Sequence, residues 1–248
     1  MRHAILGNGN LGSALVKECL KYSMEFKVFS TVTGWKYPTS LQKIYDYSPD
    51  HVWVTVGAGS VEQSHTDYKS FVDLHIRLPM ELAQTLNSCV NLHLFSTDYC
   101  NVTPQSLYAL SKKHMEESVI LMERPRTFIY RVGSLYGTAK PQKCFPYKLK
   151  KNATNKKIAL PPNCVCPTPA DWLAQELMAP ILELEQFKEL TPITIAPGGC
   201  VTVKEWGEMI LGEEVDMAAM DKLRPMECTH TKWRPAPIWL ELWKERNP

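Results

Sequence analysis

Tyr108 and Lys112 form the pair of side chains with the clearest potential for acid–base chemistry in this sequence. They stand four positions apart, a spacing that places both on one face of a helix. A nearby ammonium favours the phenolate, so we expect Lys112 to lower the pKa of Tyr108 and to make the phenol a proton donor or acceptor nearer neutral pH. Because this spacing is common, a solvent-exposed pair on a helix surface is the alternative interpretation.

Hydroxyl-bearing residues stand a short way upstream of this pair. Residues 92–96 read LHLFS, which is typical of a buried strand. The strand ends at Ser96, and Thr97, Asp98 and Tyr99 follow it directly. Ligands of open α/β sheets bind at the carboxyl ends of the strands. We therefore expect these side chains to lie at the same site as the tyrosine–lysine pair.

A glycine-rich loop near the start of the sequence has the pattern that binds the diphosphate of a dinucleotide. The pattern is G-x-G-x-x-G, between an expected strand at residues 3–6 and an expected helix at residues 11–22. Its glycines allow a tight turn and close approach of the backbone to pyrophosphate, and the helix N-terminus supplies N–H donors. A turn without a ligand is the alternative, which this strand–loop–helix context disfavours. The loop consists of Gly7, Asn8, Gly9, Asn10, Leu11 and Gly12.

The end of the second expected strand indicates which dinucleotide would bind. Sites that prefer NAD usually carry Asp or Glu about 20 residues beyond the loop, where the carboxylate holds the ribose hydroxyls. Residues 29–33 contain no acid. Ser30 and Thr31, with Lys36 nearby, suit a ribose 2′-phosphate better. We therefore expect NADP(H), with NAD(H) as the alternative.

The elements that must position these residues alternate between strands and helices. We expect strands at residues 3–6, 26–30, 51–56, 92–96 and 127–132, and helices at 11–22, 68–86 and 107–122, with Pro79 kinking or breaking the second helix. This alternation predicts an α/β fold of the Rossmann type with a doubly wound parallel sheet. A helix at 169–184, a strand at 192–196 and a helix near residue 202 follow. We expect a dinucleotide-binding domain at 1–137 and a smaller C-terminal α/β substrate lobe at 138–248, some of whose elements rejoin the main sheet.

Composition excludes several classes of protein. Of 248 residues, 44% are hydrophobic, and 28 Lys and Arg nearly balance 26 Asp and Glu. This balance predicts no nucleic-acid or membrane partner, and no apolar run reaches the roughly 18 residues of a membrane span. The sequence opens directly into a strand, with no room for a signal peptide, so we expect a cytoplasmic protein. The eight cysteines lack metal-ligand spacing, so we expect reduced structural thiols and no metal site.

These motifs, taken in order, resemble those of the extended short-chain dehydrogenases/reductases, most closely the dTDP-4-dehydrorhamnose reductase group. The resemblance covers nearly the whole sequence, and the ordered set is more specific than any single motif. The matching pieces are the glycine loop, residues 48–52, residues 96–99, Tyr108 with Lys112, residues 131–137, residues 166–174, residues 195–199, residues 203–206, and Arg224 with Pro225.

The resemblance implies an NADPH-dependent reductase of a nucleotide-linked 4-keto-6-deoxy sugar. In that role Tyr108 protonates the carbonyl oxygen, Lys112 holds the nicotinamide ribose and Thr97 hydrogen-bonds the reacting oxygen. The resemblance also allows a homodimer. The implied cofactor contacts are Gly7, Gly9, Asn10, Leu11, Gly12, Ser30, Thr31, Gly57, Ala58, Gly59, Ser96, Tyr108 and Lys112, and the implied substrate contacts are Thr97, Asp98, Tyr99, Arg131 and Arg224.

The sequence departs from the family pattern at four places. The glycine loop is one residue shorter than usual, and Gly57-Ala58-Gly59 replaces the usual Asn-Ala-Ala. His75 stands where relatives have a helix Asn that supports the lysine through water, and a surface histidine is the simpler interpretation. Only eight residues separate Tyr99 from Tyr108, where relatives have a longer substrate loop.

These departures keep two further functions open. One is a non-catalytic NADP-binding regulatory subunit. The other is a sugar-nucleotide epimerase or dehydratase of the same superfamily that keeps its cofactor bound. In a combined epimerase–reductase, Cys100 would act as an acid or base. A buried structural thiol is the favoured interpretation of Cys100. The lysine-rich stretch at 148–157 is best explained as a solvated loop, with a diphosphate contact as the alternative.

Overall fold

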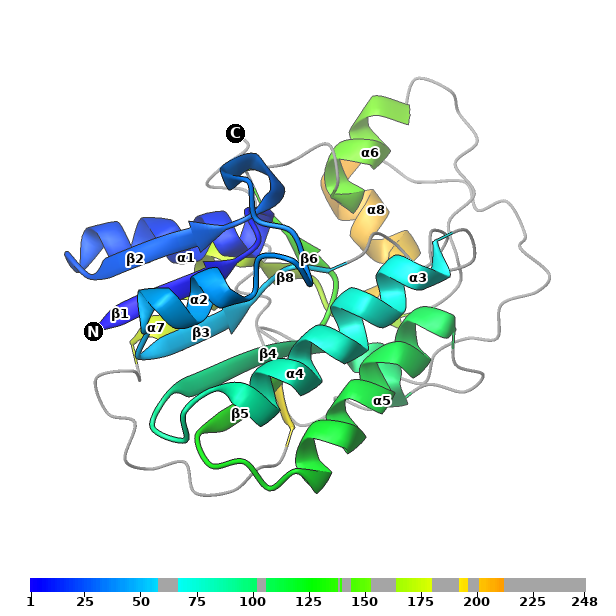
Figure 1. The fold of residues 1–248 in the computed structure, drawn as a ribbon. Helices are drawn as coiled ribbons and strands as arrows, with labels where there is room; N and C mark the ends of the chain where they lie inside the picture. Colours follow the sequence, from blue (N-terminus) through cyan, green and yellow to red (C-terminus); the bar gives the residue numbers. More distant parts are fainter. Residues whose placement is uncertain are drawn as a thin grey trace.

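A parallel sheet with helices on both faces forms the centre of the computed structural model (Figure 1). The structure describes residues 1–57, 67–101, 106–137, 139, 144–152, 164–179, 192–195 and 201–211. The sheet has six strands in the order β2-β1-β3-β4-β5-β9, and every neighbouring pair is parallel. The strands are β1 (Arg2–Leu6), β2 (Glu25–Phe29), β3 (His51–Val54), β4 (Asn91–Thr97), β5 (Thr127–Val132) and β9 (Ile193–Ile195). The expected α/β class and parallel sheet are confirmed.

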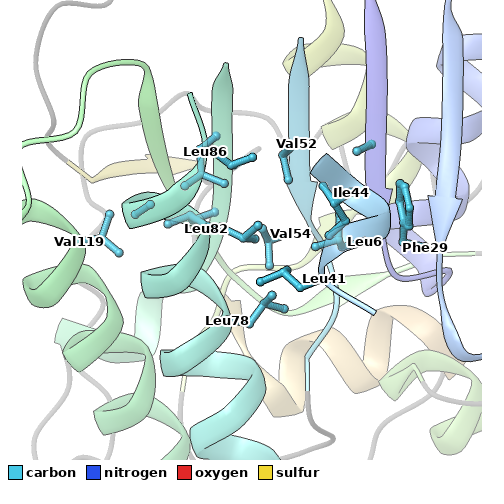
Figure 2. Packing of buried hydrophobic residues seen from close by; sticks show 14 of the residues in the cluster. Leu6, Phe29, Leu41, Ile44, Val52, Val54, Leu78, Leu82, Leu86 and Val119 are labelled. Atoms are coloured by element: carbon cyan, nitrogen blue, oxygen red, sulfur yellow. The ribbon is translucent and has the colours of Figure 1, made fainter. Parts of the chain in front are cut away.

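Alternation along the strands gives the sheet two apolar faces. In β1, Ile5 faces one helical layer, while Ala4 and Leu6 face the other. The first layer contains α1 (Asn10–Lys21) and α7 (Ala170–Met178), and the second contains α2 (Gln42–Tyr47), α4 (Leu78–Thr85) and α5 (Leu107–Leu121). Figure 2 shows the second layer, where Leu78 and Leu82 of α4 pack toward Val54 of β3.

The order of the strands locates the edge where a ligand would bind. The chain passes from β1 to β2 on one side, then returns to β3 on the other side of β1. Ligands of doubly wound sheets bind beyond the carboxyl ends of the strands at such a reversal. Between β2 and β3 the chain forms a short 3-10 turn (Thr31–Thr33) and α2, so β3 is the third strand in sequence. The glycine loop follows β1 and therefore lies at this reversal.

The expected helix at 68–86 is divided into three parts. They are α3 (Tyr68–Phe71), a π-helical segment (Val72–Arg77) and α4. Pro79 has no N–H, and in a regular α-helix its ring would clash with the carbonyl group of His75. The backbone widens before the proline instead, and the N–H of Leu78 donates to the carbonyl oxygen of Asp73, five residues earlier. The break expected at Pro79 is thus a π turn.

Three histidines occupy one buried face of the sheet, where the sequence suggested ordinary apolar strands. His51 Nδ1 lies 3.0 Å from His93 Nε2, and His93 Nδ1 lies 3.0 Å from the Tyr130 hydroxyl. Asn91 donates to His51 Nε2 at 3.4 Å, and the Trp53 indole donates to His3 Nδ1 at 3.2 Å. Asn91, His51, His93 and Tyr130 thus form a chain that neutral imidazoles can complete. His3 stacks on His51, and its buried Nε2 has no hydrogen-bond partner among the described residues.

A smaller group of elements follows residue 137. It contains α6 (Phe145–Asn152) and α8 (Val203–Leu211), the antiparallel strands β7 (Cys164–Val165) and β10 (Val201–Thr202), and the parallel strands β6 (Leu135–Tyr136) and β8 (Thr168–Pro169). Its own apolar cluster is centred on Trp206, which lies 4.7 Å from Phe145 between ring centroids. Strand β9 joins β5 in the main sheet, while α7 packs on α1. The boundary at residue 137 remains a prediction.

The described residues also bear on the expectations about cysteines, metals and membranes. Cys19, Cys89, Cys100 and Cys144 are reduced thiols outside any disulfide, but Cys166 is disulfide-bonded, so the expectation that all thiols are reduced is wrong at that position. Among the residues described, no group of three or more His, Cys, Asp or Glu side chains could hold a metal ion. No helix in the described ranges is long and apolar enough to span a bilayer.

Candidate functional site

The glycine loop places three glycines in three different environments. Gly7 has φ of +107°, a conformation that favours glycine, and a Cβ there would lie 2.9 Å from the backbone nitrogen of Val56. A Cβ on Gly12 would lie 2.2 Å from the carbonyl oxygen of Gly7. A Cβ on Gly9 would have no atom within 4 Å. Gly7 and Gly12 therefore serve close packing, whereas Gly9 faces open space.

The N-terminus of α1 adjoins that open space. Gly9 is its N-cap residue and provides no side-chain hydrogen bond, and the first turn contains no acidic residue. Helix N-termini of this kind present N–H groups and a positive dipole to an anion. The residues present therefore fit the diphosphate of a dinucleotide. The Asn10 amide is turned toward the smaller group of elements, where it donates to Cys144 Sγ at 3.0 Å.

A cavity of about 280 Å³ connects the glycine loop with the expected catalytic pair. Its walls come from the loop, from the ends of β3, β4 and β5, from the π turn and from α5. Seven of the residues predicted from the sequence motifs line it: Gly9, Asn10, Leu11, Gly57, Ser96, Tyr108 and Lys112. The lining residues are Gly9, Asn10, Leu11, Val54, Thr55, Val56, Gly57, His75, Phe95, Ser96, Tyr108, Lys112, Val132, Gly133 and Leu135.

Tyr108 lies at the start of α5, opposite the end of β4. The hydroxyl of Ser106 caps this helix by accepting from the N–H of Ala109 at 3.1 Å. Burial raises the pKa of Tyr108, and the nearby Asp98 carboxylate raises this pKa further, while a hydrogen bond with Thr97 opposes the increase. The expectation of a lowered pKa is therefore wrong for this structure. The phenol is fully protonated at neutral pH.

Lys112 lies one turn further along α5 with its ammonium buried. Its Nζ donates to the carbonyl oxygen of Phe95 at 2.9 Å. Burial lowers the pKa of Lys112 to about 8, and the neighbouring Cys100 and Glu116 oppose this decrease. The solvent-exposed pair considered as an alternative is excluded, because Lys112 is buried and Tyr108 is half-buried.

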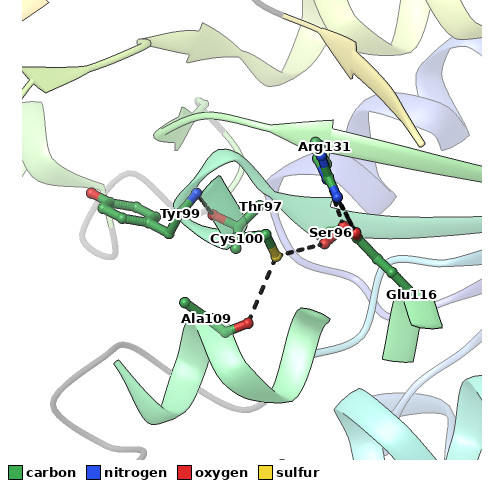
Figure 3. Close-up of polar contacts among 7 residues, drawn as sticks. All are labelled: Ser96, Thr97, Tyr99, Cys100, Ala109, Glu116 and Arg131. Carbon is green, nitrogen blue, oxygen red and sulfur yellow. Dashed lines mark hydrogen bonds and ion pairs between the residues drawn. The ribbon is translucent and has the colours of Figure 1, made fainter. Parts of the chain in front are cut away.

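Thr97 and Asp98 are both buried at the end of β4. The Thr97 hydroxyl donates to Asp98 Oδ1 at 3.2 Å and accepts from the N–H of Tyr99 at 3.3 Å. Burial raises the pKa of Asp98 to about 6. The ring of Tyr99 extends away from the other contacts of this group (Figure 3). Thr97 thus fixes the turn that follows the strand and also reaches the phenol of Tyr108.

Arg131 and Cys100 have structural partners close to this site (Figure 3). The Arg131 guanidinium forms a two-pronged ion pair with Glu116, with Nε 2.9 Å from Oε1 and a terminal nitrogen 2.5 Å from Oε2. This pair ties β5 to α5, a role other than the expected contact with substrate. Cys100 Sγ lies 3.5 Å from Ser96 Oγ, and burial raises the pKa of the thiol. A buried structural thiol is therefore the better account of Cys100.

The remaining predicted contacts lie at the end of β2 or outside the described residues. Ser30 is buried, and its N–H donates to the Thr33 hydroxyl at 2.9 Å, whereas Thr31 is exposed. Ala58, Gly59, Arg224 and most of the lysine-rich stretch at 148–157 lie outside the residues whose side chains the structure describes.

His75 is the main functional candidate whose burial at the cavity the sequence did not indicate. It is 1% exposed and lines the cavity, so the interpretation as a surface histidine is wrong. His75 lies in the π turn, which has one residue more than a regular α-helical turn and so changes the direction of the side chain. The helical periodicity of the sequence does not reveal that additional residue. Gly133 and Leu135 also line the cavity, and the motif at 131–137 was the signal for them.

Solved structures share this fold over nearly the whole chain. A dTDP-4-dehydrorhamnose reductase from Bacillus anthracis in complex with NADP has a TM-score of 0.78 at 17% identity, covering 98% of this chain and 97% of that chain. The Clostridium acetobutylicum dTDP-4-dehydrorhamnose reductase has a TM-score of 0.75 at 20% identity, covering 98% and 93%. A UDP-glucose 4-epimerase from Thermotoga maritima with UDP-glucose has a TM-score of 0.73 at 14% identity, covering 99% of both chains.

These matches define the class of fold. It is the fold of the extended short-chain dehydrogenases/reductases, as the motifs predicted, and dTDP-4-dehydrorhamnose reductases are among its matches. UDP-glucose 4-epimerases also share it, with TM-scores of 0.68 and 0.73, so the fold is common to enzymes that modify sugar nucleotides. No family model matches the sequence, and no curated protein is detectably similar to it.

Proposed function

We propose that this protein is an NADPH-dependent reductase of a nucleotide-linked 4-keto-6-deoxy sugar. The observation that supports it most directly is the single cavity lined by the glycine loop, Tyr108 and Lys112. A dinucleotide seated on that loop would supply hydride chemistry, with the protein responsible for placement and proton transfer.

The environment of Tyr108 suits reduction. Delivery of a hydride to a ketone leaves an alkoxide that must gain a proton. The raised pKa of Tyr108 keeps the phenol protonated, so it holds the proton that this step needs. Thr97 hydrogen-bonds the same phenol, and its hydroxyl would turn from Asp98 Oδ1 to donate to the reacting oxygen.

Lys112 and the helix α1 would hold the cofactor. The Lys112 ammonium is fixed by the Phe95 carbonyl at the floor of the cavity, where it would donate to a ribose hydroxyl. The open space at Gly9 and the uncapped α1 terminus would hold the diphosphate. Ser30, Thr31 and exposed Lys36 support NADP(H) over NAD(H), because no carboxylate stands at residues 29–33 to repel a 2′-phosphate.

The proposal is tested by following NADPH oxidation with dTDP-, UDP- and GDP-linked 4-keto-6-deoxy sugars. We expect turnover with at least one of them. The variant Tyr108→Phe should lose about 10²- to 10⁴-fold in kcat, the contribution of a positioned general acid. Binding of NADPH, measured by its fluorescence, should change less than about twofold, since the ring and its packing remain.

Other outcomes would favour the other functions. Tight NADPH binding without turnover on any of the sugars would favour the non-catalytic regulatory subunit. Isomerisation of a sugar nucleotide by protein that retains bound NAD(H) after purification would favour the epimerase. Turnover that Tyr108→Phe leaves unimpaired would exclude the proposed mechanism.

A further inference from the structure

His75 belongs to a cluster of three aromatic rings around the phenol of Tyr108. The His75 and Tyr108 rings meet edge to face, with centroids 5.5 Å apart and planes at 80°. Phe71 contacts both, with centroids 4.7 Å from His75 and 6.3 Å from Tyr108. Edge-to-face contacts have preferred geometries, so two such neighbours restrict the plane of the Tyr108 ring.

Hydrogen bonds determine which nitrogen of His75 carries its proton. The Ser111 hydroxyl donates its single hydrogen to the carbonyl oxygen of Tyr108 at 2.8 Å. Ser111 Oγ also lies 3.0 Å from His75 Nδ1, so in this second contact it must accept. Nδ1 is therefore the protonated nitrogen. The chain His75–Ser111–Tyr108 ends on the backbone of the reacting residue itself.

Gly57 leaves room for the opposite side of the imidazole. A Cβ at residue 57 would lie 3.2 Å from His75 Nε2, closer than such contacts normally allow. His75 has little freedom to retreat, because it is buried, bonded to Ser111 and packed against Phe71. A side chain at residue 57 would therefore have to displace the His75 ring by a few tenths of an ångström, so the glycine and the histidine fit together. Both residues depart from the family pattern. Because they contact each other, we treat the two departures as one linked change.

The charges around the ring keep it neutral. Burial lowers the pKa of His75 to about 2, and the ammonium of Lys112 contributes to the decrease. Among the described residues, Phe71, Ser111 and Tyr108 also contact the ring, and none of these three carries a carboxylate. His75 therefore holds its neighbours by contact and hydrogen bonding and does not relay a proton.

We propose that His75 is a positioning residue for Tyr108, and that Gly57 and His75 act as one unit that orients the phenol in the cavity. The kinetic part of this proposal rests on the proposed function, since it needs a measurable reduction.

A double-mutant cycle of Gly57→Ala and His75→Asn tests the unit. Asn keeps an amide donor for Ser111 but lacks the ring that would contact a new methyl group. We expect each single variant to lower kcat about 10- to 100-fold, as misplacement of a catalytic group does, with little change in KM for the sugar nucleotide. Gly57→Ala should have no further effect in the His75→Asn background. Independent effects that multiply would overturn the proposal.

A second measurement does not depend on turnover. The ¹⁵N shifts of His75 in the cofactor-free protein should show a neutral ring with the proton on Nδ1 from pH 5 to 8, and Ser111→Ala should abolish this preference. A proton on Nε2, or titration of His75 in this range, would overturn the proposal even in an active reductase. Should turnover be absent, the proposed function fails, and coupling between the two substitutions in the melting temperatures of the four proteins still decides whether Gly57 and His75 act as one unit.

His75→Phe keeps the interpretation open to test if His75→Asn does not fold. Phe retains a ring against Tyr108 but cannot donate to Ser111. We expect it to bind NADPH normally and to lose kcat by less than about 10-fold relative to the unmodified protein, because the ring contact with Tyr108 remains. Equal kcat in His75→Phe and the unmodified protein would show that the bond to Ser111 contributes nothing.

Discussion

Gly9 and Gly12 lack side chains for opposite reasons. At Gly12 the neighbouring backbone fills the space that a methyl group would need, whereas at Gly9 that space is open. The motif identified both as glycines of a diphosphate-binding loop. It could not show which of them serves packing and which serves a ligand, because that distinction depends on where Gly7 and the strand β3 lie in three dimensions.

The two glycines therefore give a matched pair of variants. Gly12→Ala should destabilise the protein severely, because the methyl carbon would lie 2.2 Å from the Gly7 carbonyl oxygen. Gly9→Ala should fold with an unchanged melting temperature but bind NADPH more weakly, by roughly 10-fold or more, because the methyl group would occupy the approach of the diphosphate. Thermal unfolding and fluorescence titration measure the two effects. If Gly12→Ala instead bound NADPH weakly and kept the melting temperature of the unmodified protein, Gly12 would serve the ligand and not the packing.

Lys112 makes cofactor binding dependent on pH. Its pKa of about 8 means that it is charged at neutral pH and loses its proton as the pH rises through 8. A neutral amine is a weaker donor to a ribose hydroxyl, so NADPH affinity should fall between pH 7 and 9. Lys112→Met should bind more weakly at pH 7 and lack this dependence. A dependence that survives in Lys112→Met would assign it to another group.

At the scale of elements, the strands and long helices were predictable because their periodicity is strong. The strand expected at 127–132 coincides with β5, and the helix expected at 107–122 differs from α5 by one residue. The short helices α2 and α6 were not predicted, since six and eight residues give little periodicity. The three histidines of the sheet were also missed, because His3, His51 and His93 occupy apolar positions of their strands.

The three histidines of the sheet predict instability in acid. Burial lowers the pKa of His3 to about 4 and of His51 to about 3, and it holds the pKa of His93 well below 6.5. All three are neutral in the folded protein but would be protonated in the unfolded chain below about pH 6.5. The stability that these three histidines contribute is therefore full above that pH and is lost at about 4 kcal/mol per pH unit near pH 5, with His75 adding to this loss and the raised pKa of Asp98 opposing it.

Urea unfolding at pH 7, 6 and 5 measures this slope. Nearby charges alter it only in part: Asp50 opposes the decrease in pKa at His3 and His51, and the N-terminal ammonium adds to it. His51→Gln should reduce the slope by about one proton, or 1.4 kcal/mol per pH unit. His114 is exposed on α5, so His114→Gln is the control and should leave the slope unchanged. Equal slopes in both variants would contradict the prediction.

At the scale of the molecule, the segments before and after residue 137 share one core. Helix α7 packs on α1, where Lys17 and Asp171 form an ion pair at 3.4 Å, and β9 extends the sheet beside β5. Gly133 touches the later segment directly, since a Cβ there would lie 2.1 Å from the Cys166 carbonyl oxygen. Composition predicted a change near residue 137, but it carried no information about these contacts.

A chain that ends at residue 137 should therefore not fold by itself. It would leave the sheet face uncovered where Leu173, Leu177 and Met178 of α7 are buried. Burial of each such side chain contributes about 1.5–3 kcal/mol, so their loss approaches the net stability of a domain, roughly 5–15 kcal/mol. We expect a non-cooperative thermal transition and strong binding of a hydrophobic dye. A cooperative transition near that of the full chain would instead support an independent domain at 1–137.

The π-helical segment before Pro79 has a consequence for the length of the chain. A π turn amounts to an α-helix with one residue inserted, and one residue corresponds to about 100° of rotation about the helix axis. Deleting one residue between Val72 and Arg77 would let the helix close regularly, yet it would rotate Phe71 away from the Tyr108 ring. Chains with and without this residue would share the fold but not the ring cluster. The number of residues in this segment therefore distinguishes chains that carry this site.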